Sequence, residues 1–348
     1  MSFRSNFLRQ LPVVTPATFE SAALALFQYQ SAYCPPYAAY LAQLGRNPSA
    51  VTRLVDIPFL PIEFFKTHEV RTDPAWHDPA GHEPAGHGPI AWEAQEVFLS
   101  SGTTLQQRSR HLVREPLLYR ENAARIFEES YGPLTGWVFL ALLPSYLEQG
   151  NSSLVAMVDY FARQSGQAQP AFFLHDHAAL RAALAGAKQV TGRRVMLLGV
   201  SYALLDFAAE AGPAPELQGL TVLETGGMKG RRREMIREEL HQELQQAFGP
   251  AGIHSEYGMT ELLSQAYSLG DGRFHCPAPL RVLLREPSDP FSLTEFRPNG
   301  AINMIDLANV DSCAFIETKD LARMHSDGSF EVLGRMDNSD VRGCNQMV

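Results

Sequence analysis

The sequence predicts an α/β protein that combines a parallel sheet with a β-rich part. From residue 136 onward, short apolar segments typical of buried strands alternate with longer segments typical of helices. This alternation favours parallel strands joined by crossover helices. From Phe274 onward, strand-like segments follow one another without long helices, which predicts a β-rich part packed on the parallel one. The expected strands are 137–142, 171–174, 194–198, 220–224, 253–256, 280–285, 301–307, 313–317 and 330–333, and the expected helices are 153–164, 177–187, 202–211 and 231–248.

Helix-end signals support individual elements. A pair of serines precedes the apolar-periodic run at residues 153–164 and Gly166 follows it, as expected for the two ends of a helix. Residues 19–44 are expected to be mostly helical, with a break at Pro35-Pro36, because proline is tolerated only in the first turn of a helix.

Composition and charge are ordinary for a globular protein and exclude some classes. The chain has 348 residues, of which 45% are hydrophobic and 19% charged, so a sizeable core can form. A formal charge of −9 argues against a general nucleic-acid partner. The basic run at residues 231–233 is followed by glutamates and is expected to form a mixed helix face. No apolar run approaches the about 18 residues of a membrane span, and no signal core opens the chain, so a cytoplasmic location is expected.

Cysteines and histidines do not indicate a metal site. The four cysteines show no C-x-x-C pairing and are expected to be free thiols. Residues 73–89 contain His77, His82 and His87 among proline, glycine and aspartate, but no regular element positions these histidines. The composition therefore predicts a flexible surface loop.

The first of three informative segments is Leu99-Ser-Ser-Gly-Thr-Thr-Leu-Gln-Gln-Arg-Ser109. It follows an apolar, strand-like stretch, and its small residues let a turn present N–H groups and hydroxyls to phosphate oxygens. Arg108 adds a fixed positive charge. The spacing differs from that of the G-x-x-x-x-G-K-[ST] loop. The alternative is a solvated turn in a hairpin with residues 110–113.

The second segment is Glu256-Tyr-Gly-Met-Thr-Glu261. Tyr257 is suited to stacking on a base, Thr260 to hydrogen bonding with a phosphate, and Glu261 to holding Mg²⁺ through a hard oxygen ligand. The alternative is a helix N-terminus that Thr260 caps and at which Glu261 meets the positive end of the helix dipole.

The third segment spans residues 317–337. Asp327-Gly328 between alternating apolar residues is a strong hairpin signal, so we expect a strand, a turn and a second strand that ends at Gly334-Arg335. Asp320 is suited to accepting both hydroxyls of a ribose, as an acidic residue does in other nucleotide folds. The alternative is an ordinary turn aspartate.

Together the three segments resemble the signature motifs of the adenylate-forming superfamily, which contains acyl-CoA synthetases, luciferases and peptide-synthetase adenylation domains. Their order agrees with that superfamily. Leu105, Gln107 and Arg108 stand where the superfamily usually has Gly, Pro and Lys. The resemblance implies the N-terminal core fold of these enzymes, ATP and Mg²⁺ as cofactors, and the activation of a carboxylic acid as an acyl-adenylate.

The resemblance also implies roles for single residues. The β- and γ-phosphates would be held by Ser100, Ser101, Gly102, Thr103, Thr104 and Arg108. Gly226 and Gly227 would flank the adenine and acyl cleft, although a tight turn after a strand explains them equally well. Tyr257 would stack on adenine, Thr260 would contact the α-phosphate and Glu261 would hold Mg²⁺. Asp320 would bind the ribose, and Arg335 would contact the ribose or a phosphate.

Four further phrases are similar to the acyl-protein synthetase (LuxE-like) family, which activates a fatty acid and relays the acyl group. These phrases are residues 57–66, 143–157, 224–230 and 342–344. In that family a cysteine near the C-terminus carries the acyl group as a thioester, and Cys344 is the matching candidate. A thiol beside a cation such as Arg342 is suited to a nucleophile. The implied partner is an acyl acceptor such as an acyl-CoA-reductase-like protein.

Adenylate-forming enzymes typically continue into a small domain that contains a catalytic lysine, and this sequence lacks most of it. We therefore expect an adenylation core over residues 1–333, with its β-rich part at 274–333, and a hinge and short tail over 334–348. Lys229 is the candidate substitute for the missing lysine; the alternative is a solvated lysine at a helix start. Two other functions stay open: ligation of the acid to coenzyme A or a carrier protein, and a non-catalytic nucleotide-binding scaffold.

Overall fold

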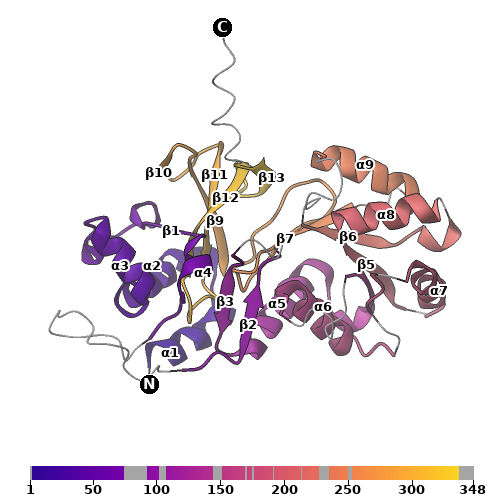
Figure 1. Ribbon diagram of the computed structural model, residues 1–348, viewed down its shortest axis with the longest axis horizontal. Helices are drawn as coiled ribbons and strands as arrows, with labels where there is room; N and C mark the ends of the chain where they lie inside the picture. The colour runs from indigo at the N-terminus through magenta and orange to yellow at the C-terminus, as the bar shows by residue number, and fades with distance from the viewer. Residues whose placement is uncertain are drawn as a thin grey trace, which may run out of the picture. The chain divides into compact units, whose positions relative to one another are not determined.

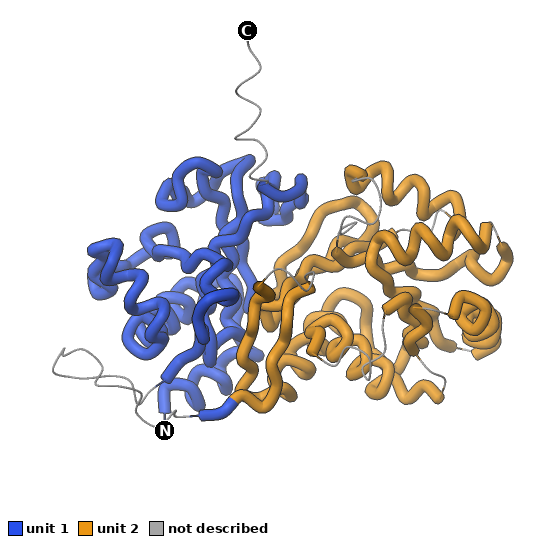
Figure 2. The backbone as a smooth tube through the Cα atoms, in the orientation of Figure 1, with its two compact units in different colours: residues 1–93, 278–348 blue, residues 94–277 orange. Residues whose placement is uncertain are grey.

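The computed structural model describes residues 2–73, 92–101, 107–143, 151–168, 171–174, 176–190, 192–212, 214–226, 235–249 and 253–336. The chain forms two compact units (Figure 2). Unit 1 contains residues 1–93 and 278–348, and unit 2 contains residues 94–277. Unit 1 thus joins the two ends of the chain. The loop expected at residues 73–89 lies outside the described residues from 74 onward, and so do residues 337–348 of the expected tail.

Unit 2 is built on a mainly parallel sheet. Its strands, in spatial order, are β4 (Trp137–Leu142), β5 (Arg194–Val200), β6 (Thr221–Thr225), β7 (Ile253–Tyr257) and β8 (Ala266–Ser268). The first four are parallel, and β8 runs antiparallel to β7. All residues of β4 are buried, which is typical of a parallel strand covered on both faces. The predicted parallel α/β part is therefore confirmed.

Helices cover both faces of this sheet (Figure 1). They are α5 (Pro116–Tyr131), α6 (Ser153–Gln164), α7 (His177–Ala187), α8 (Ser201–Ala211) and α9 (Arg237–Phe248). On one face, the ring centroid of Phe127 on α5 lies 5.4 Å from that of Phe139 on β4 and 5.0 Å from that of Phe161 on α6. On the other face, α8 and α9 pack through Phe207 and Phe248, whose centroids are 6.3 Å apart. Unit 2 also contains the antiparallel hairpin of β2 (Glu96–Leu99) and β3 (Arg110–Val113).

Two sequence expectations in unit 2 need correction. The strand expected at 171–174 is reduced to one isolated bridge, between Phe172 and Ala141. The helix expected from residue 231 begins at Arg237, because Ile236 is extended with φ −68° and ψ 156°. Glutamates at the next two positions then lie in the first turn, where the helix dipole favours negative charge. Residues 231–234 lie outside the described residues.

Unit 1 is built on a mixed sheet. Its strands, in spatial order, are β1 (Leu60–Pro61), β12 (Phe315–Met324), β11 (Asn299–Asp306), β9 (Leu280–Glu286) and β10 (Asp289–Leu293), and β13 (Phe330–Arg335) also pairs with β12. Only β1 runs parallel to its neighbour among these described strands. The hairpin turn predicted at Asp327-Gly328 is confirmed, and Gly328 has the positive φ of +84° that favours glycine there.

Among its described residues, unit 1 also contains the α-helices α1 (Phe3–Gln10), α2 (Pro16–Tyr33), α3 (Pro35–Gln43) and α4 (Phe64–Thr67). The predicted break before Pro35 is confirmed, because α2 ends and α3 begins on either side of Cys34. The centre of the core is Phe315 on β12. Its ring lies 5.8 Å from Phe27, 6.2 Å from Tyr37 and 6.2 Å from Phe59, measured between centroids.

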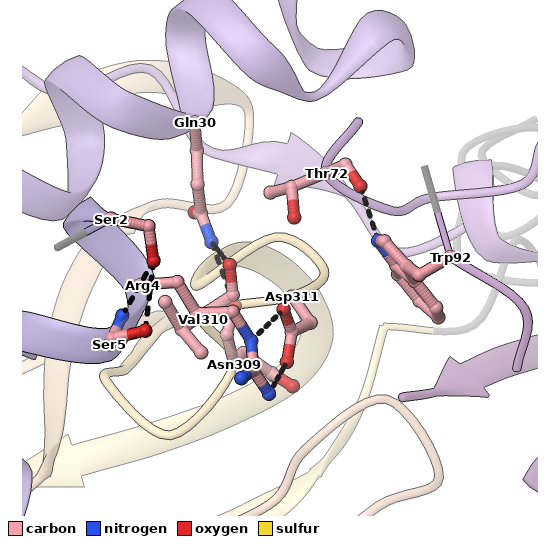
Figure 3. A network of polar contacts seen from close by, with 9 residues as sticks. All are labelled: Ser2, Arg4, Ser5, Gln30, Thr72, Trp92, Asn309, Val310 and Asp311. Carbon is pink, nitrogen blue, oxygen red and sulfur yellow. Dashed lines mark hydrogen bonds and ion pairs between the residues drawn. The ribbon is translucent and has the colours of Figure 1, made fainter. Parts of the chain in front are cut away.

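Polar side chains fasten the N-terminal helices to the segment between β11 and β12 (Figure 3). Arg4 makes a bidentate pair with Asp311, with N–O distances of 2.6 and 2.7 Å. Buried Gln30 donates to the Asn309 carbonyl at 2.7 Å and accepts from the Ala314 N–H at 2.9 Å. These contacts hold the helices of the N-terminal segment on the sheet that the C-terminal part of the chain forms. In the described part of the chain, no helix is both long and apolar enough to cross a membrane.

Candidate functional site

The Ser/Thr-rich segment connects the two strands of the β2–β3 hairpin. Leu99 pairs with Arg110, and the hairpin closes with the Ser100 N–H donating to the Ser109 carbonyl at 3.1 Å. The Ser109 N–H donates to the Ser100 hydroxyl at 2.9 Å, and Arg108 Nε donates to the Ser100 carbonyl at 2.5 Å. Ser101 is exposed. The hairpin with residues 110–113 is thus confirmed, and the phosphate-binding role of the segment stays a prediction. Gly102, Thr103 and Thr104 lie outside the described residues.

The Tyr-Gly-Met-Thr-Glu segment leaves the carboxyl end of β7 and makes a turn. Tyr257 is the buried last residue of β7, and the Leu262 N–H donates to the Met259 carbonyl at 3.1 Å. Thr260 and Glu261 occupy the centre of this turn, and Glu261 is buried. The alternative of a helix capped by Thr260 is therefore wrong. The chain has only eight residues between β7 and β8, and it turns directly back into the antiparallel strand.

Neighbouring elements hold this turn through its backbone. His111 on β3 is buried, and its Nδ1 lies 2.8 Å from the Thr260 carbonyl oxygen. That oxygen can only accept, so Nδ1 carries the proton and donates. Asn122 on α5 donates to the Leu263 carbonyl at 2.8 Å and to the Ser264 hydroxyl at 3.0 Å. The β2–β3 hairpin and the turn that carries Thr260 and Glu261 are thus held together in unit 2. The sequence does not reveal His111 or Asn122, because neither lies in a motif.

Gly226 follows β6 directly. Its φ of +71° lies in the left-handed region, where glycine is favoured, and its carbonyl accepts a hydrogen bond from the Ser201 hydroxyl at 2.5 Å. The tight turn expected after this strand is confirmed. Gly227 and Lys229, the candidate cleft glycine and the candidate catalytic lysine, lie outside the described residues.

Two carboxylates at the carboxyl ends of β6 and β7 have opposite environments. Burial by itself would raise the pKa of Glu224, but His241, Arg237 and Ser255 outweigh it and lower that pKa. Arg237 Nε lies 3.5 Å and His241 Nε2 lies 3.6 Å from Glu224 Oε1. Burial raises the pKa of Glu256 to about 7, against a hydrogen bond from the Thr225 hydroxyl and with added repulsion from Glu224. The sequence motif contains Glu256 but gives no sign of its raised pKa.

Asp320 and Arg335 belong to unit 1 and lie opposite each other on β12 and β13. Arg335 Nε is 3.3 Å from Asp320 Oδ1, and the side chain of Asp320 is largely buried whereas that of Arg335 is exposed. The structure therefore brings the two residues of the third segment together. It separately brings Ser100, Arg108 and Thr260 onto one hairpin and turn in unit 2.

Mg²⁺ at Glu261 fits the donor chemistry of the turn. Among the described residues no group of three or more His, Cys, Asp or Glu is placed to hold a metal ion. Mg²⁺ is commonly held by one or two carboxylates together with substrate phosphates and water. The single buried carboxylate of Glu261 is compatible with that mode. Cys344 lies outside the described residues.

Comparison with known proteins agrees with the fold. No family model matches the sequence, and no curated protein matches it. The chain resembles the solved structure of ATP-bound MatB from Rhodopseudomonas palustris, with 19% identity, a TM-score of 0.50 and 74% of this chain covered. An ATP-bound RpMatB–BxBclM chimera matches with 18% identity, a TM-score of 0.51 and the same coverage.

A third resemblance is to a double mutant of o-succinylbenzoate CoA synthetase (MenE) from Bacillus subtilis, bound to a product analogue, with 16% identity, a TM-score of 0.50 and 70% of this chain covered. The matches span 51%, 51% and 49% of the MatB, chimera and MenE chains, so this protein corresponds to about half of their length. The fold is that of the N-terminal part of adenylate-forming enzymes, as the sequence predicts.

Proposed function

We propose that this protein activates a carboxylic acid with ATP and transfers the acyl group to a protein thiol. The observation that carries the proposal is the hydrogen bond between His111 and Thr260, which ties the strand that directly follows the first signature segment to the second segment. Two motifs that are far apart in the sequence must lie near each other if they contribute to one site, and this contact meets that requirement. The fold shared with adenylate-forming enzymes supports the same chemistry.

In the first step, a carboxylate oxygen attacks the α-phosphorus of ATP. The bond from that phosphorus to the bridging oxygen of the β-phosphate breaks, and pyrophosphate leaves with both electrons of the bond. Catalysis requires charge stabilisation and positioning rather than proton transfer. The hairpin residues and Arg108 hold the β- and γ-phosphates, Thr260 contacts the α-phosphate, and Lys229 supplies a further positive charge. Mg²⁺ held by Glu261 would neutralise phosphate charge when bound.

Tyr257 stacks on the adenine, and Gly226 and Gly227 leave space for it. Asp320 accepts hydrogen bonds from the ribose hydroxyls, and Arg335 contacts the ribose or a phosphate.

In the second step, the Cys344 thiolate attacks the acyl carbon. The bond between that carbon and the oxygen of AMP breaks, AMP leaves, and a thioester remains. A partner similar to an acyl-CoA reductase would then receive the acyl group. We take a long-chain fatty acid as the substrate, on the sequence resemblance to acyl-protein synthetases, and a cytoplasmic location.

A second candidate is ligation of the acid to coenzyme A, in which Cys344 takes no part. The resemblance to a solved CoA synthetase favours it.

The test is acid-dependent exchange between ATP and labelled pyrophosphate, with short, long and aromatic acids. A parallel gel follows hydroxylamine-sensitive acyl label on the wild type and on Cys344→Ala. Exchange with label that the variant loses supports self-acylation. Exchange without label supports coenzyme A or another external thiol as the acceptor. ATP binding without exchange for any acid indicates a non-catalytic scaffold and contradicts the proposal.

A further inference from the structure

Arg285 lies in a buried polar cluster inside unit 1. It is on β9 and only 2% exposed, and its Nη2 donates to Glu317 Oε1 and to the Thr318 carbonyl, each at 3.0 Å. Asn303 on β11 is fully buried and pairs with Glu317 across the sheet. The register places Arg285 opposite Ala301, two residues before Asn303, so these side chains share one face. An arginine on β9 thus reaches across β11 to the backbone of β12.

The contacts of Arg285 meet β12 at a bulge. The pairing of β11 with β12 shifts there, so that residues 318–320 of β12 stand opposite Ile302 alone. Asp320 lies in this bulge. The Thr318 hydroxyl donates to the Ile302 carbonyl at 2.9 Å and accepts from the Asp320 N–H at 3.2 Å. Arg285 therefore bonds to the backbone of Thr318, and the side chain of Thr318 bonds to the backbone of Asp320.

Stability alone does not account for this cluster. Within the described residues, Nε and Nη1 of Arg285 and both amide atoms of Asn303 are buried without a hydrogen-bond partner. Burying unpaired polar groups is unfavourable by about 1–3 kcal/mol each, and well-packed apolar residues often replace a buried ion pair without loss of stability. Such costs are typical of positions where geometry matters for function.

We propose that Arg285 is a positioning residue for the nucleotide. It holds the β12 bulge through the Thr318 carbonyl, and the bulge presents the Asp320 carboxylate to the ribose hydroxyls. The inference rests on the proposed function, in which Asp320 binds ribose. Arg285 itself touches no substrate in this arrangement, so its effect is on ribose recognition rather than on the reacting phosphate.

Arg281 provides a matched control. It is on the same strand and face as Arg285, and its guanidinium lies 4.1 Å from the centroid of the Phe19 ring. Arg281→Met removes a cation from the same sheet face without touching the bulge. Arg285→Met removes both hydrogen bonds to β12, and Arg285→Lys keeps the charge on a shorter, non-planar head group that does not reproduce the position of Nη2.

The experiment measures the affinities of the full-length protein for ATP, 2′-deoxy-ATP and 3′-deoxy-ATP by calorimetry. The wild type is expected to prefer ATP about tenfold over either analogue, as one charge-assisted hydrogen bond predicts. Arg285→Met is expected to lose most of that preference, as Asp320→Asn does, and the double variant is expected to lose no more than Asp320→Asn alone. Arg285→Lys should be intermediate, and Arg281→Met should keep the full preference.

The outcomes separate this inference from the proposed function. A folded Arg285→Met or Arg285→Lys with the full preference for ATP overturns the positioning role while the function stands. If Arg281→Met loses the preference for ATP as fully as Arg285→Met does, the positioning role is also overturned, because the cause would then be a general weakening of the sheet. If Arg285→Met fails to fold, the lysine variant decides. A wild type that binds no ATP overturns the proposed function, and this inference with it.

Discussion

The turn that carries Thr260 in unit 2 and the bulge that carries Asp320 in unit 1 are held in different ways. The turn is fixed by an imidazole and an amide, His111 and Asn122, whose N–H groups donate to backbone carbonyls at 2.8 Å. The bulge is fixed by a buried cation, and its aspartate is further paired with Arg335. In both regions a backbone group of the candidate residue is held: the Thr260 carbonyl accepts from His111, and the Asp320 N–H donates to the Thr318 hydroxyl.

The two kinds of holding group predict different functional consequences. At Thr260 the donors bond to backbone carbonyls, so the phosphates and their counter-charges set the local electrostatics, as expected where the reaction occurs. Near Asp320 the guanidinium of Arg285 is paired with Glu317 within the protein, as expected for a binding contact that does not change during the reaction. Changes in the turn should therefore alter the rate, and changes in the bulge should alter nucleotide affinity.

The largest expected effect is at Glu261. Glu261→Gln should reduce the rate of acid-dependent pyrophosphate exchange by roughly 100-fold or more, the typical loss when one electrostatic stabiliser of a transition state is removed. Titration with Mg²⁺ should show weaker Mg²⁺ binding, so that a higher Mg²⁺ concentration is needed for half-maximal exchange. Asp320→Asn should instead raise the KM for ATP with a smaller change in kcat. Exposed Glu243→Gln is the control. Equal changes in kcat for both site variants would contradict the division between turn and bulge.

The next effect concerns the pH dependence of stability through Glu256. Glu317 and Asp320 in unit 1 each lie beside an arginine, whereas burial and Glu224 raise the pKa of Glu256 from 4.5 to about 7. The folded state therefore binds the proton more tightly than the unfolded state. The protonated Glu256 therefore stabilises the folded state fully when the pH is below 4.5, the ordinary pKa of a glutamate. This stabilisation is lost as the pH rises through about 7, and the free energy of unfolding falls by about 1–3 kcal/mol.

Urea denaturation of the wild type and Glu256→Gln at pH 5 and pH 8 measures this effect. The amide resembles the protonated carboxyl, so the variant should be close to the wild type at pH 5 and more stable at pH 8. A difference that does not change between the two pH values would show that Glu256 has an ordinary pKa.

Local signals in the sequence account for much of the fold. The expected bounds of β4, α6 and α7 agree with the structure, because their apolar runs and end signals are continuous in sequence. The short strands β1, β8 and β10 are absent from the expectations. Their pairing depends on the neighbouring strand rather than on their own pattern, as at Leu60, which pairs with Ile316.

The residues of the candidate site also fall into those that local sequence signals reveal and those that only the fold reveals. The motifs locate Thr260, Glu261 and Asp320, since small turns and acidic residues give a recognisable local pattern. His111 and Arg285 act through residues that are distant in sequence, and only the strand register shows which backbone groups they reach. One sequence contains no signal for such a pairing.

A smaller effect is expected at His111. His111→Phe removes the donor to the Thr260 carbonyl and should lower the free energy of unfolding by about 1–2 kcal/mol and the exchange rate by about tenfold. His111→Gln keeps an N–H donor on a longer side chain and should restore part of both losses. Chemical denaturation and exchange kinetics at fixed Mg²⁺ check the two quantities. Rescue of stability without any rescue of rate would mean that His111 does not position Thr260.

The smallest stability effect is expected at Arg335, whose side chain is 69% exposed while it pairs with Asp320 at 3.3 Å. Exposed ion pairs contribute about 0–1 kcal/mol because solvent screens them, so Arg335→Gln should leave the thermal midpoint almost unchanged. The same variant should raise the KM for ATP several-fold if Arg335 contacts the nucleotide. Arg323→Gln is the matched control, since Arg323 pairs with Glu331 on the same two strands at 3.3 Å. If both variants change the KM equally, the charge of the hairpin and not a contact from Arg335 is responsible; if only Arg335→Gln does, the bulge and the end of β13 recognise the nucleotide together.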